Sequence, residues 1–330
     1  MQIPPDRLEI LRHFRSISYH VGKNILMKKR PDIIKNGRFD IKDDGHKVDQ
    51  VTVADKASEK YIFSEIEKFD TNASNIGEED GRTILNPNRF YIVDPLDGTG
   101  IFSGEVEKLA KTSEAIKDFG KFNITARPID FQKYCVFLSY VENNESVVEM
   151  MYVPELKETA FAVKGIGAFY QHGNSKYIPL KVSEDKPISE SVAAITYLRK
   201  VLKSDYQERF TPFINTMLKF PTLGSFGFTS AIYESMSTTL PKNASNGKPD
   251  VYLNPQQYLW DCPSLILNEA GGLAMMVTEK DGKISIDEFS HANFDITNKD
   301  SDLFKQPYGI ASGNPYLVEK FVKNLENELK

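Results

Sequence analysis

Hydrophobic residues recur at spacings of three and four in three parts of the chain, the pattern of an amphipathic helix. The first part runs from Asp6 to about Lys29 and contains Leu8, Leu11, Phe14, Ile17, Val21 and Ile25. The second follows Thr52 and contains Ala54, Ser58, Ile62 and Ile66. The third covers residues 317–329. We therefore predict helices over these segments, with Asp55 in the first turn of the second one, where exposed amide dipoles favour a carboxylate.

Shorter apolar runs and alternating patterns predict strands between these helices. Residues 89–93 form a β-rich run that stops at Asp94, residues 132–141 and 146–152 read as a hairpin, and residues 159–170 read as a further strand. Residues 250–253 predict another strand, and residues 260–270 a buried helix closed by Gly271 and Gly272. The first half is typical of helices on an antiparallel-rich sheet and the second of an α/β arrangement.

The change of pattern after the polar stretch 182–191 predicts two domains, 1–188 and 189–330. The first would carry the acidic motifs described below and the second would supply Asp261. A highly charged segment, about 103–130, lies between the turn at Asp94 and the hairpin, and its apolar spacing permits a helix. We interpret this segment as an insertion or lid beside the turn.

Composition and charge limit the classes of protein to which this chain can belong. The 330 residues contain 41 Lys plus Arg and 46 Asp plus Glu, a net charge of −5, without the basic excess of a protein that binds DNA or RNA. No run of apolar residues is long enough to span a membrane, and the N-terminus carries charges where a signal peptide is apolar, so we expect a cytosolic protein. Cys135 and Cys262 are far apart and are expected to be buried, reduced thiols.

Acidic residues stand where predicted elements begin or end. Glu78, Glu79 and Asp80 follow Gly77, Asp94 and Asp97 flank Pro95, and Asp261 follows Trp260. Carboxylates are the hard oxygen ligands that Mg²⁺ prefers, and a tight turn lets Asp94 and Asp97 point into one crevice. The amides of Gly98 and Thr99, which follow at once, suit a phosphate. Carboxylates beside a phosphate cradle imply a bridging metal ion.

Each of these features also has a structural interpretation. The turn at Asp94 can be an Asx turn, the loop after Gly77 can be a solvated loop, and Asp55 and Asp261 can serve as helix-start charges. The joint occurrence of the features favours a metal site.

Five segments together resemble the lithium-sensitive, magnesium-dependent phosphatases that include inositol monophosphatase and the 3′(2′),5′-bisphosphate nucleotidases. YIVDPLDGTGIF is similar to that family's W-I-[IV]-D-P-[IL]-D-G-T-x-x-F, and NIGEED to its G-E-E loop. YLWDCPSLILNEAGG is similar to W-D-x-A-A-x-x-x-[IL]-x-x-E-A-G-G, VTVADKASEKYI to V-T-x-A-D-x-x-[SA]-E-x-x-[IL], and FAVKGIGAFY to x-A-x-x-G-x-G-A-[FY]. The segments follow the family's order and are spread from about residue 51 to 272, so the resemblance covers most of the chain.

The resemblance implies an α/β fold, a five-layer αβαβα sandwich with the site in a cleft between two domains. It assigns one Mg²⁺ to Glu78, Asp94 and the Leu96 carbonyl, and a second to Asp94, Asp97 and Asp261, with a third, weaker ion on Glu78 and water. It makes Thr99 and Asp55 the pair that activates the attacking water. It also assigns the binding of phosphate to the amides of Gly98 and Thr99. The implied protein is a homodimer that hydrolyses a small phosphate monoester and is inhibited by lithium.

Departures from the family pattern concern the substrate. Inositol monophosphatases carry a Glu where this chain has Asn254. The nucleotidases usually carry a Lys directly after D-G-T, where this chain has Gly100 followed by Ile101. Ser225 lies where the family places substrate contacts, and Pro263 and Ser264 replace the usual Ala pair. Inositol phosphate and a nucleotide 3′-phosphate therefore both stay open. Fructose-1,6-bisphosphatases share D-P-L-D-G but typically continue with two serines.

Other classes fit less well. Haloacid-dehalogenase-type phosphatases need two aspartates two residues apart, and here the gap is three. An EF-hand needs acidic residues at loop positions 1, 3 and 5 before a Gly, which this chain lacks. A family member that binds metal or phosphate without catalysis remains the non-enzymatic alternative.

Overall fold

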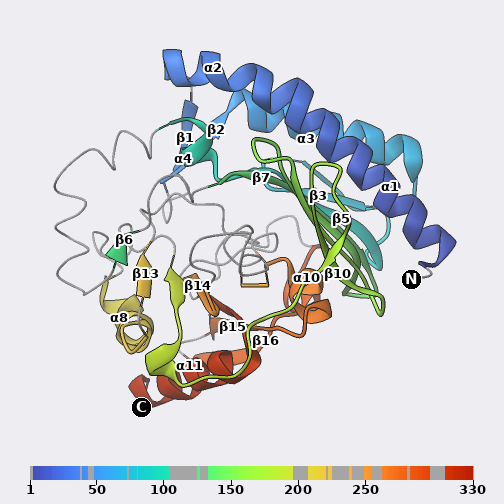
Figure 1. The fold of residues 1–330 in the computed structure, drawn as a ribbon. Helices are drawn as coiled ribbons and strands as arrows, with labels where there is room; N and C mark the ends of the chain where they lie inside the picture. The colour runs from blue at the N-terminus through green and yellow to red at the C-terminus, as the bar shows by residue number, and fades with distance from the viewer. Residues whose placement is uncertain are drawn as a thin grey trace.

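A layer of helices formed by the first seventy residues covers one face of the molecule (Figure 1). In the computed structural model, α1 (Pro5–His20), the π-helical η1 (Val21–Leu26) and α2 (Met27–Asn36) follow one another directly. The predicted first helix is confirmed and extends further, to Gly37, whose left-handed backbone (φ 61°) ends it. A short hairpin, β1 (Phe39–Asp43) and β2 (Val48–Thr52), leads into α3 (Val53–Phe69), the predicted second helix.

The structure describes part of the chain. The described residues are 3–37, 39–43, 48–72, 74–79, 81–104, 125–126, 133–195, 207–220, 222–224, 238–239, 249–254, 262–280, 283–297 and 309–329. Most of the segment predicted as an insertion, including its expected helix, lies outside these ranges.

Beneath the helical layer lies an eight-stranded sheet in the order β11-β10-β9-β8-β7-β5-β3-β4. All its neighbouring strands are antiparallel except β3 and β5, which are parallel. Its strands are β3 (Ser74–Gly77), β4 (Arg82–Thr83), β5 (Arg89–Asp97), β7 (Cys135–Glu142), β8 (Glu145–Val153), β9 (Glu158–Val163), β10 (Gly167–His172) and β11 (Ile178–Pro179).

The β7–β8 hairpin is confirmed, and its two-residue turn, Asn143-Asn144, has the positive φ values that such turns require. The single strand predicted over residues 159–170 is wrong. The chain reverses there between β9 and β10, because Gly165 (φ 74°) and Gly167 (φ 122°) adopt backbone conformations that other residues rarely reach. The alternating pattern continues through the turn, so it did not reveal the break.

A second, seven-stranded sheet has the order β16-β15-β17-β14-β12-β13-β6. β12, β13, β14 and β6 are mutually parallel, whereas β15, β16 and β17 pair antiparallel. β6 comes from the segment that we interpreted as an insertion, so part of that segment adds an edge strand to this sheet. The strands are β6 (Thr125–Ala126), β12 (Ala193–Ile195), β13 (Thr222–Gly224), β14 (Val251–Asn254), β15 (Leu273–Lys280), β16 (Lys283–Glu288) and β17 (Ile310–Gly313).

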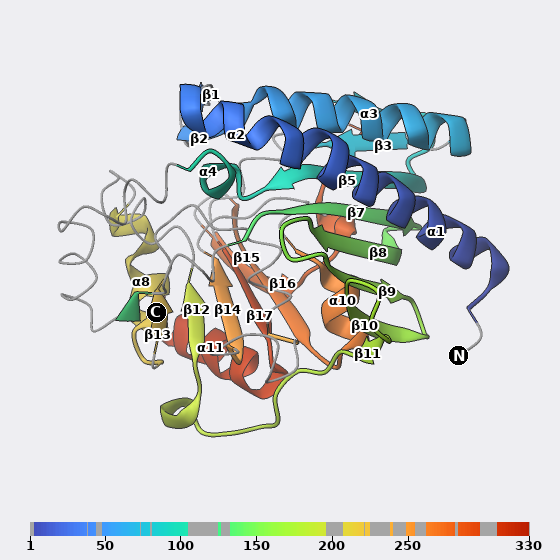
Figure 2. The same cartoon turned by 45° about the horizontal axis from the view of Figure 1, so that its top comes forward.

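Helix α10 (Ser264–Glu269) lies between the two sheets. It packs against β8, β9 and β10 of one sheet and β15 of the other. Helices α8 (Gln207–Met217) and α11 (Pro315–Glu328) pack on each other, and α11 lies on β15 and β17, beyond the second sheet (Figure 2). The order helices, sheet, helix, sheet, helices confirms the predicted five-layer αβαβα sandwich. Three single-turn helices complete the description: α4 (Thr99–Phe102), η3 (Ile188–Glu190) and η4 (His291–Asn293).

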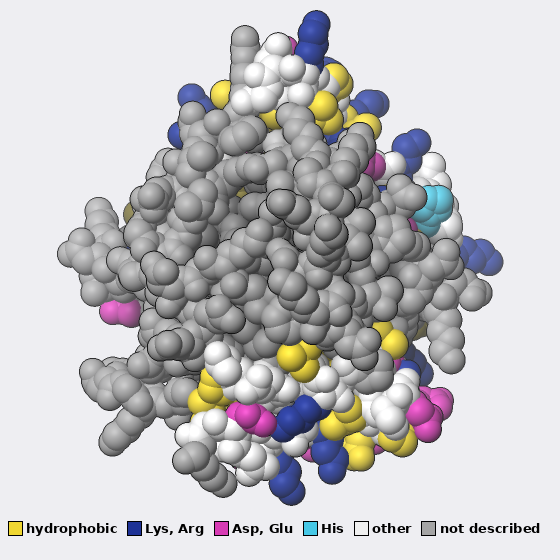
Figure 3. Space-filling model, turned by 90° about the vertical axis from the view of Figure 1, so that its left-hand side faces the viewer, with side chains coloured by type: hydrophobic (Ala, Val, Ile, Leu, Met, Phe, Trp, Pro, Cys, Tyr) yellow, Lys and Arg dark blue, Asp and Glu magenta, His cyan; other side chains and the backbone are white. Residues whose placement is uncertain are grey.

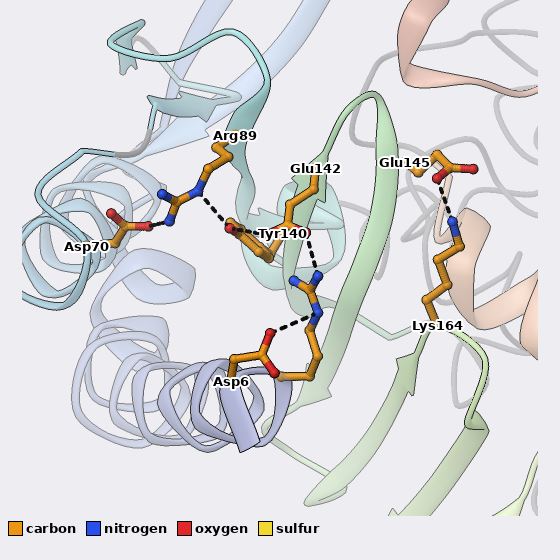
Figure 4. A network of polar contacts seen from close by, with 8 residues as sticks. Asp6, Asp70, Arg89, Tyr140, Glu142, Glu145 and Lys164 are labelled. Atoms are coloured by element: carbon orange, nitrogen blue, oxygen red, sulfur yellow. Dashed lines mark hydrogen bonds and ion pairs between the residues drawn. The ribbon is translucent and has the colours of Figure 1, made fainter. Parts of the chain in front are cut away.

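Polar contacts join the outer helices to the first sheet at the end where β5 begins (Figure 4). Arg89 pairs with Asp70, the residue that ends α3, at 2.6 Å, and also donates to the Tyr140 hydroxyl at 3.0 Å. The same hydroxyl donates to Glu142, which accepts from Arg7 of α1 at 2.5 Å. Pairs as exposed as these contribute up to about 1 kcal/mol each. They fix the far end of α3 relative to β5, whose other end carries Asp94 and Asp97.

Charges of both signs are mixed on the surface. On the face shown in Figure 3, the described Lys and Arg side chains are interspersed with acidic and hydrophobic ones. Both cysteines are buried thiols that form no disulfide, as predicted. Among the helices within the described ranges, none combines the length and the apolar character needed to cross a membrane.

Candidate active site

The parallel pairing of β3 and β5 brings two of the acidic motifs to one sheet edge. Gly77, at the end of β3, is the register partner of Val93, and the Glu78 amide donates to the Val93 carbonyl at 3.1 Å. Parallel strands end at the same edge of a sheet, so Glu78 leaves β3 beside the point where β5 reaches Asp94. These two motifs are therefore neighbours in space as well as in the family pattern.

An irregularity in β5 sets the direction of its two aspartates. We predicted that the strand stops at Asp94, but β5 continues to Asp97 with a register shift, because Asp94 pairs with Phe137 and Asp97 pairs with Cys135. Residues three apart on a regular strand lie on opposite faces, whereas the extra residue in this bulge returns Asp97 to the face of Asp94. Pro95, which has no amide hydrogen for the ladder, lies in the bulge.

This shared face is the one that α10 covers. Phe137 and Cys135, the partners of the two aspartates, belong to the apolar cluster that includes Leu265 and Ile266 of α10. Asp94 and Asp97 are only 2% and 6% exposed. Asp94 accepts a hydrogen bond from the Leu96 amide at 3.0 Å, which is the Asx turn of the structural interpretation, and the Cys135 thiol lies 4.0 Å from Asp97. Both carboxylates are thus buried on the face of the sheet that α10 covers.

Asp55 and Thr99 are in direct contact. The Thr99 hydroxyl donates to Asp55 Oδ1 at 2.9 Å and lies 3.1 Å from the Leu96 carbonyl oxygen. Asp55 Oδ2 accepts from the Thr52 amide at 2.8 Å and the Thr52 hydroxyl at 2.5 Å, while the Thr52 hydroxyl accepts from the Ala54 amide. These bonds form the capping box that starts α3. Asp55 therefore stabilises the start of the helix, as its structural interpretation held. It also contacts Thr99 in the turn Asp97-Gly98-Thr99, the DGT turn.

Burial raises the pKa of the Asp55 carboxyl to about 6, although the hydrogen bonds from Thr52 and Thr99 act in the opposite direction. The side chain is fully buried, and burial disfavours the charged form of a carboxylic acid. A carboxylate with a pKa this close to neutrality is able to take up and release a proton under ordinary conditions.

The turn at Gly98 leads into α4. Gly98 has a left-handed backbone (φ 93°), and its carbonyl accepts hydrogen bonds from the amides of Ile101 and Phe102. The first amides of a helical turn have no acceptor within the helix and point toward its start. Because Thr99 opens this turn, its amide and that of Gly98 lie at the same end of β5 as the two aspartates.

Glu59 is a residue of the site that sequence reasoning missed. It follows Asp55 by one helical turn on α3, and its carboxylate oxygens accept the amides of Glu79 and Gly81, each at 2.9 Å. A Cβ built on Gly77 would lie 2.1 Å from Glu59 Oε2, so glycine permits this close approach. Glu59 thus holds the loop that carries Glu78. It stands in the segment VTVADKASEKYI, and its spacing of four from Asp55 is the signal that could have found it.

Of the other predicted site residues, the structure describes Asn254. Asp261 and Ser225 are outside the described residues. Asn254 ends β14 in the other sheet, where it is fully buried and paired with Ile310. The structure therefore brings together Asp55 with Thr99 and, at one sheet edge, Glu78, Asp94 and Asp97.

The oxygen donors at this edge fit a hard divalent cation. Burying two carboxylates on one sheet face is costly, and a cation would offset that cost. Within the described ranges, no three His, Cys, Asp or Glu side chains are grouped closely enough to hold a metal ion.

Comparisons with known proteins identify the family and the fold of the chain. The sequence matches the inositol monophosphatase family over residues 10–329. It is 29% identical over 241 residues to a fructose-1,6-bisphosphatase/inositol-1-monophosphatase of Thermotoga maritima, covering 71% of this chain and 73% of the relative. It is 27% identical over 282 residues to an inositol monophosphatase of Dictyostelium discoideum, covering 83% and 89%. The extragenic suppressor protein SuhB of Bartonella henselae shares the fold, with a TM-score of 0.65 at 20% identity and coverages of 96% and 98%.

A sandwich of two sheets with buried carboxylates at a strand edge defines an α/β protein with a candidate phosphate and metal site. The chain belongs to the inositol monophosphatase family. It is a phosphoric monoester hydrolase, and the enzymes of this family are metal-dependent phosphatases.

Proposed function

We propose that this protein is a Mg²⁺-dependent, lithium-sensitive phosphomonoesterase that hydrolyses a small phosphorylated metabolite to an alcohol and phosphate. The observation that carries the proposal is the hydrogen bond between Thr99 and Asp55, 2.9 Å long, beside the buried carboxylates Asp94 and Asp97. A proton acceptor, a hydroxyl and hard oxygen donors meet at one strand end, which are the parts that a phosphate ester hydrolase needs.

Asp55 and Thr99 would serve as the catalytic pair. The one hydroxyl hydrogen of Thr99 has two acceptors within reach, and Asp55 offers the shorter contact and the negative charge. The hydroxyl oxygen then accepts a hydrogen bond from the attacking water. As that water attacks phosphorus, its proton passes to Thr99 while the Thr99 proton passes to Asp55.

Glu78, Asp94, Asp97, Asp261 and the Leu96 carbonyl would hold two Mg²⁺ ions, and a third would bind more weakly at Glu78. When bound, the ions would neutralise phosphate oxygens, activate the water and stabilise the leaving alkoxide. The amides of Gly98 and Thr99 would bind phosphate and orient it in line with the water. Lithium would inhibit by competing for a Mg²⁺ position.

The substrate class rests on Asn254 and Ser225. Asn254 presents an amide where a Glu would accept hydrogen bonds from inositol hydroxyls, so its donor and acceptor groups fit a different alcohol. A 3′(2′),5′-bisphosphate nucleotidase, which acts on adenosine 3′,5′-bisphosphate, is the second candidate, and Gly100, which stands where such enzymes usually carry a Lys, counts against it. The homodimeric state and the cytosolic location stay predictions.

Phosphate release with Mg²⁺ from inositol 1-phosphate, adenosine 3′,5′-bisphosphate and fructose 1,6-bisphosphate, measured in parallel with and without lithium, tests the proposal. Asp94→Asn should abolish turnover and leave the far-UV circular dichroism unchanged. A preference for adenosine bisphosphate would identify a nucleotidase, and a preference for inositol phosphate would show that Asn254 does not exclude inositol. A wild-type protein inert toward all phosphate monoesters would support a non-catalytic binding role instead.

A further inference from the structure

Helix α4 is a single turn that follows β5, and its first residue is Thr99. The Gly98 carbonyl accepts the amides of Ile101 and Phe102, and the Thr99 carbonyl accepts the Ser103 amide at 2.8 Å. A single helical turn is unstable by itself, because fixing its backbone costs more free energy than its hydrogen bonds return. Contacts with other elements must therefore hold this turn, and with it the Thr99 hydroxyl, in place.

Arg30 of α2 contacts the other end of the turn. Its Nε donates to the Phe102 carbonyl at 3.2 Å, and its Nη2 donates to the Ile101 carbonyl at 3.4 Å. Carbonyls at the end of a helical turn lack amide partners within it, and a cation is a favourable partner for them. Ile34, one helical turn further along α2, lies against the residues after the turn, since a Cβ built on Gly104 would lie 3.4 Å from Ile34 Cγ1. Helix α2 therefore holds the end of α4, next to which it lies in Figures 1 and 2.

Other contacts fix the guanidinium group of Arg30. Its Nη1 pairs with Glu155, in the turn between β8 and β9. Its central carbon lies 5.3 Å from the centroid of the Tyr134 ring. That buried ring packs edge-on against Phe102, with the ring centroids 5.1 Å apart. Each of the three guanidinium nitrogens thus has its own partner, an arrangement that the single ammonium group of a lysine cannot reproduce.

The two ends of α4 move together, because the turn spans four residues, a length of about 6 Å. At its start the Thr99 hydroxyl donates to Asp55 Oδ1 at 2.9 Å, and at its end Arg30 holds two carbonyls. A shift of the end therefore displaces the Thr99 hydroxyl, and a misplacement of about 1 Å is enough to slow a reaction about 100-fold. Asp94 and Asp97, by contrast, are held by the pairing of β5 with β7.

Resting on the proposed function, we propose that Arg30 is a positioning residue for Thr99, holding the end of α4 so that the hydroxyl at its start stays in contact with Asp55. Loss of the guanidinium group slows the chemical step, because Thr99 is then aligned with Asp55 for a smaller fraction of the time. It leaves Mg²⁺ binding unchanged, since the proposed ligands Asp94 and Asp97 are held by β7.

Arg30→Met keeps the aliphatic part of the side chain and removes its donors. Phosphate release with Mg²⁺ is measured on whichever of inositol 1-phosphate, adenosine 3′,5′-bisphosphate and fructose 1,6-bisphosphate the wild-type protein hydrolyses fastest. We expect kcat to fall at least about tenfold, with KM and the Mg²⁺ concentration for half-maximal activity within about threefold of wild type. Arg30→Lys should lie between Arg30→Met and wild type. Lys29→Met, at an exposed position on the same helix, should behave as wild type does.

Two further measurements separate positioning from a general loss of stability. In a Thr99→Val background the hydroxyl is absent, so Arg30→Met should lower kcat by no more than about twofold further. Amide hydrogen exchange of the metal-free protein, followed by mass spectrometry, gives a readout that does not depend on activity. Arg30→Met should speed the exchange of residues 98–104 about tenfold or more and leave that of residues 89–97 unchanged.

If Arg30→Met does not fold, Arg30→Lys takes its place, with an expected fall in kcat of at least about threefold. Wild-type kcat in the folded variant, or an equal fall in the wild-type and Thr99→Val backgrounds, would overturn this inference alone. Wild-type exchange over residues 98–104 would do the same. A wild-type protein that is inert toward all phosphate monoesters would overturn the proposed function and the inference together.

Discussion

The Asp55 carboxylate is shared between two threonines that lie 47 positions apart in the chain. Oδ2 completes the capping box with Thr52, and Oδ1 accepts from Thr99. Because Oδ2 is held by the amide and the hydroxyl of Thr52 at the start of α3, the carboxylate has little freedom to turn away from Thr99. A charged acceptor held in this way orients the hydroxyl at no further entropic cost when substrate binds.

Thr99→Val removes the hydroxyl and preserves the shape of the side chain. We expect kcat to fall about 100-fold or more, because proton transfer through a positioned group contributes this much, while KM changes little. Thr99→Ser keeps the hydroxyl and serves as the matched control, with kcat within about tenfold of wild type. Steady-state phosphate release checks both variants, and a Thr99→Val enzyme with wild-type kcat would remove Thr99 from the mechanism.

Glu149 makes stability depend on pH. The folded-state pKa is about 7, raised by burial above the ordinary value of 4.5, so the folded protein keeps the proton over a range in which the unfolded chain has lost it. The contribution of Glu149 to the free energy of unfolding is fully present below pH 4.5 and is lost as the pH rises through 7. This contribution is about 3 kcal/mol in total. Glu149→Gln should remove that part of the dependence. Urea unfolding of metal-free protein at pH 5 and pH 8 measures it, and an unchanged pH dependence in the variant would contradict the prediction.

Among the elements, α3 carries two carboxylates that act on different parts of the site. Asp55 contacts the DGT turn after β5, and Glu59, one helical turn later, holds the loop after β3. The far end of the helix is fixed to the start of β5 by the Asp70–Arg89 pair. Because both ends of α3 are tied to β5, the two loops keep a constant relation to each other.

Gly77→Ala tests the contact between α3 and the Glu78 loop. The new Cβ would lie 2.1 Å from Glu59 Oε2, so the loop or Glu59 must shift, and we expect a loss of about 2 kcal/mol in the free energy of unfolding. In a Glu59→Ala background only the 3.0 Å approach to Phe63 Cζ remains, so the same substitution should cost less. Glu67→Ala, an exposed position on the same helix, is the control for Glu59→Ala. Equal costs of Gly77→Ala in both backgrounds would show that Glu59 is not the obstacle.

Sequence patterns predicted the elements whose signals are local. The apolar stripe of α1 and the cap at Thr52 are written in neighbouring residues, and both helices were found. The reversal between β9 and β10 was missed because the alternation of side chains runs through it, and the bulge in β5 was missed because only its pairing with β7 reveals it.

The same distinction holds for the site. Asp55, Asp94 and Thr99 stand in short motifs, so the sequence alone nominated them. Glu59 and Glu149 act on amides in distant parts of the chain, Glu79 and Ile266. Any residue can supply a backbone amide, so no pattern of residue types marks the acceptor's partner; the spacing of Glu59 from Asp55 places it on the same helix face, and only the fold shows which amides it binds.

At the scale of the whole molecule, α10 contacts both sheets. It packs on β8, β9 and β10 from one side and on β15 from the other, and Glu269 at its end accepts the amide of Gly165 in the β9–β10 turn at 2.6 Å. The proposed metal ligands follow the same division, since Glu78, Asp94 and Asp97 belong to the first sheet and Asp261 precedes α10 in the chain. Metal binding should therefore stabilise the contact between the layers and not one layer alone.

Mg²⁺ should accordingly raise the thermal stability of the whole protein. An ion that binds only the folded state adds about 2.7 kcal/mol at a concentration of 100 times its Kd, which is a rise of a few degrees in Tm for a chain of this size. Asp94→Asn removes a ligand assigned to both ions and should abolish most of this shift, whereas Glu67→Ala should keep it. Differential scanning calorimetry with MgCl₂, against KCl of equal ionic strength, separates the specific effect from screening. A shift of equal size in Asp94→Asn would mean that the ions which stabilise the fold bind elsewhere.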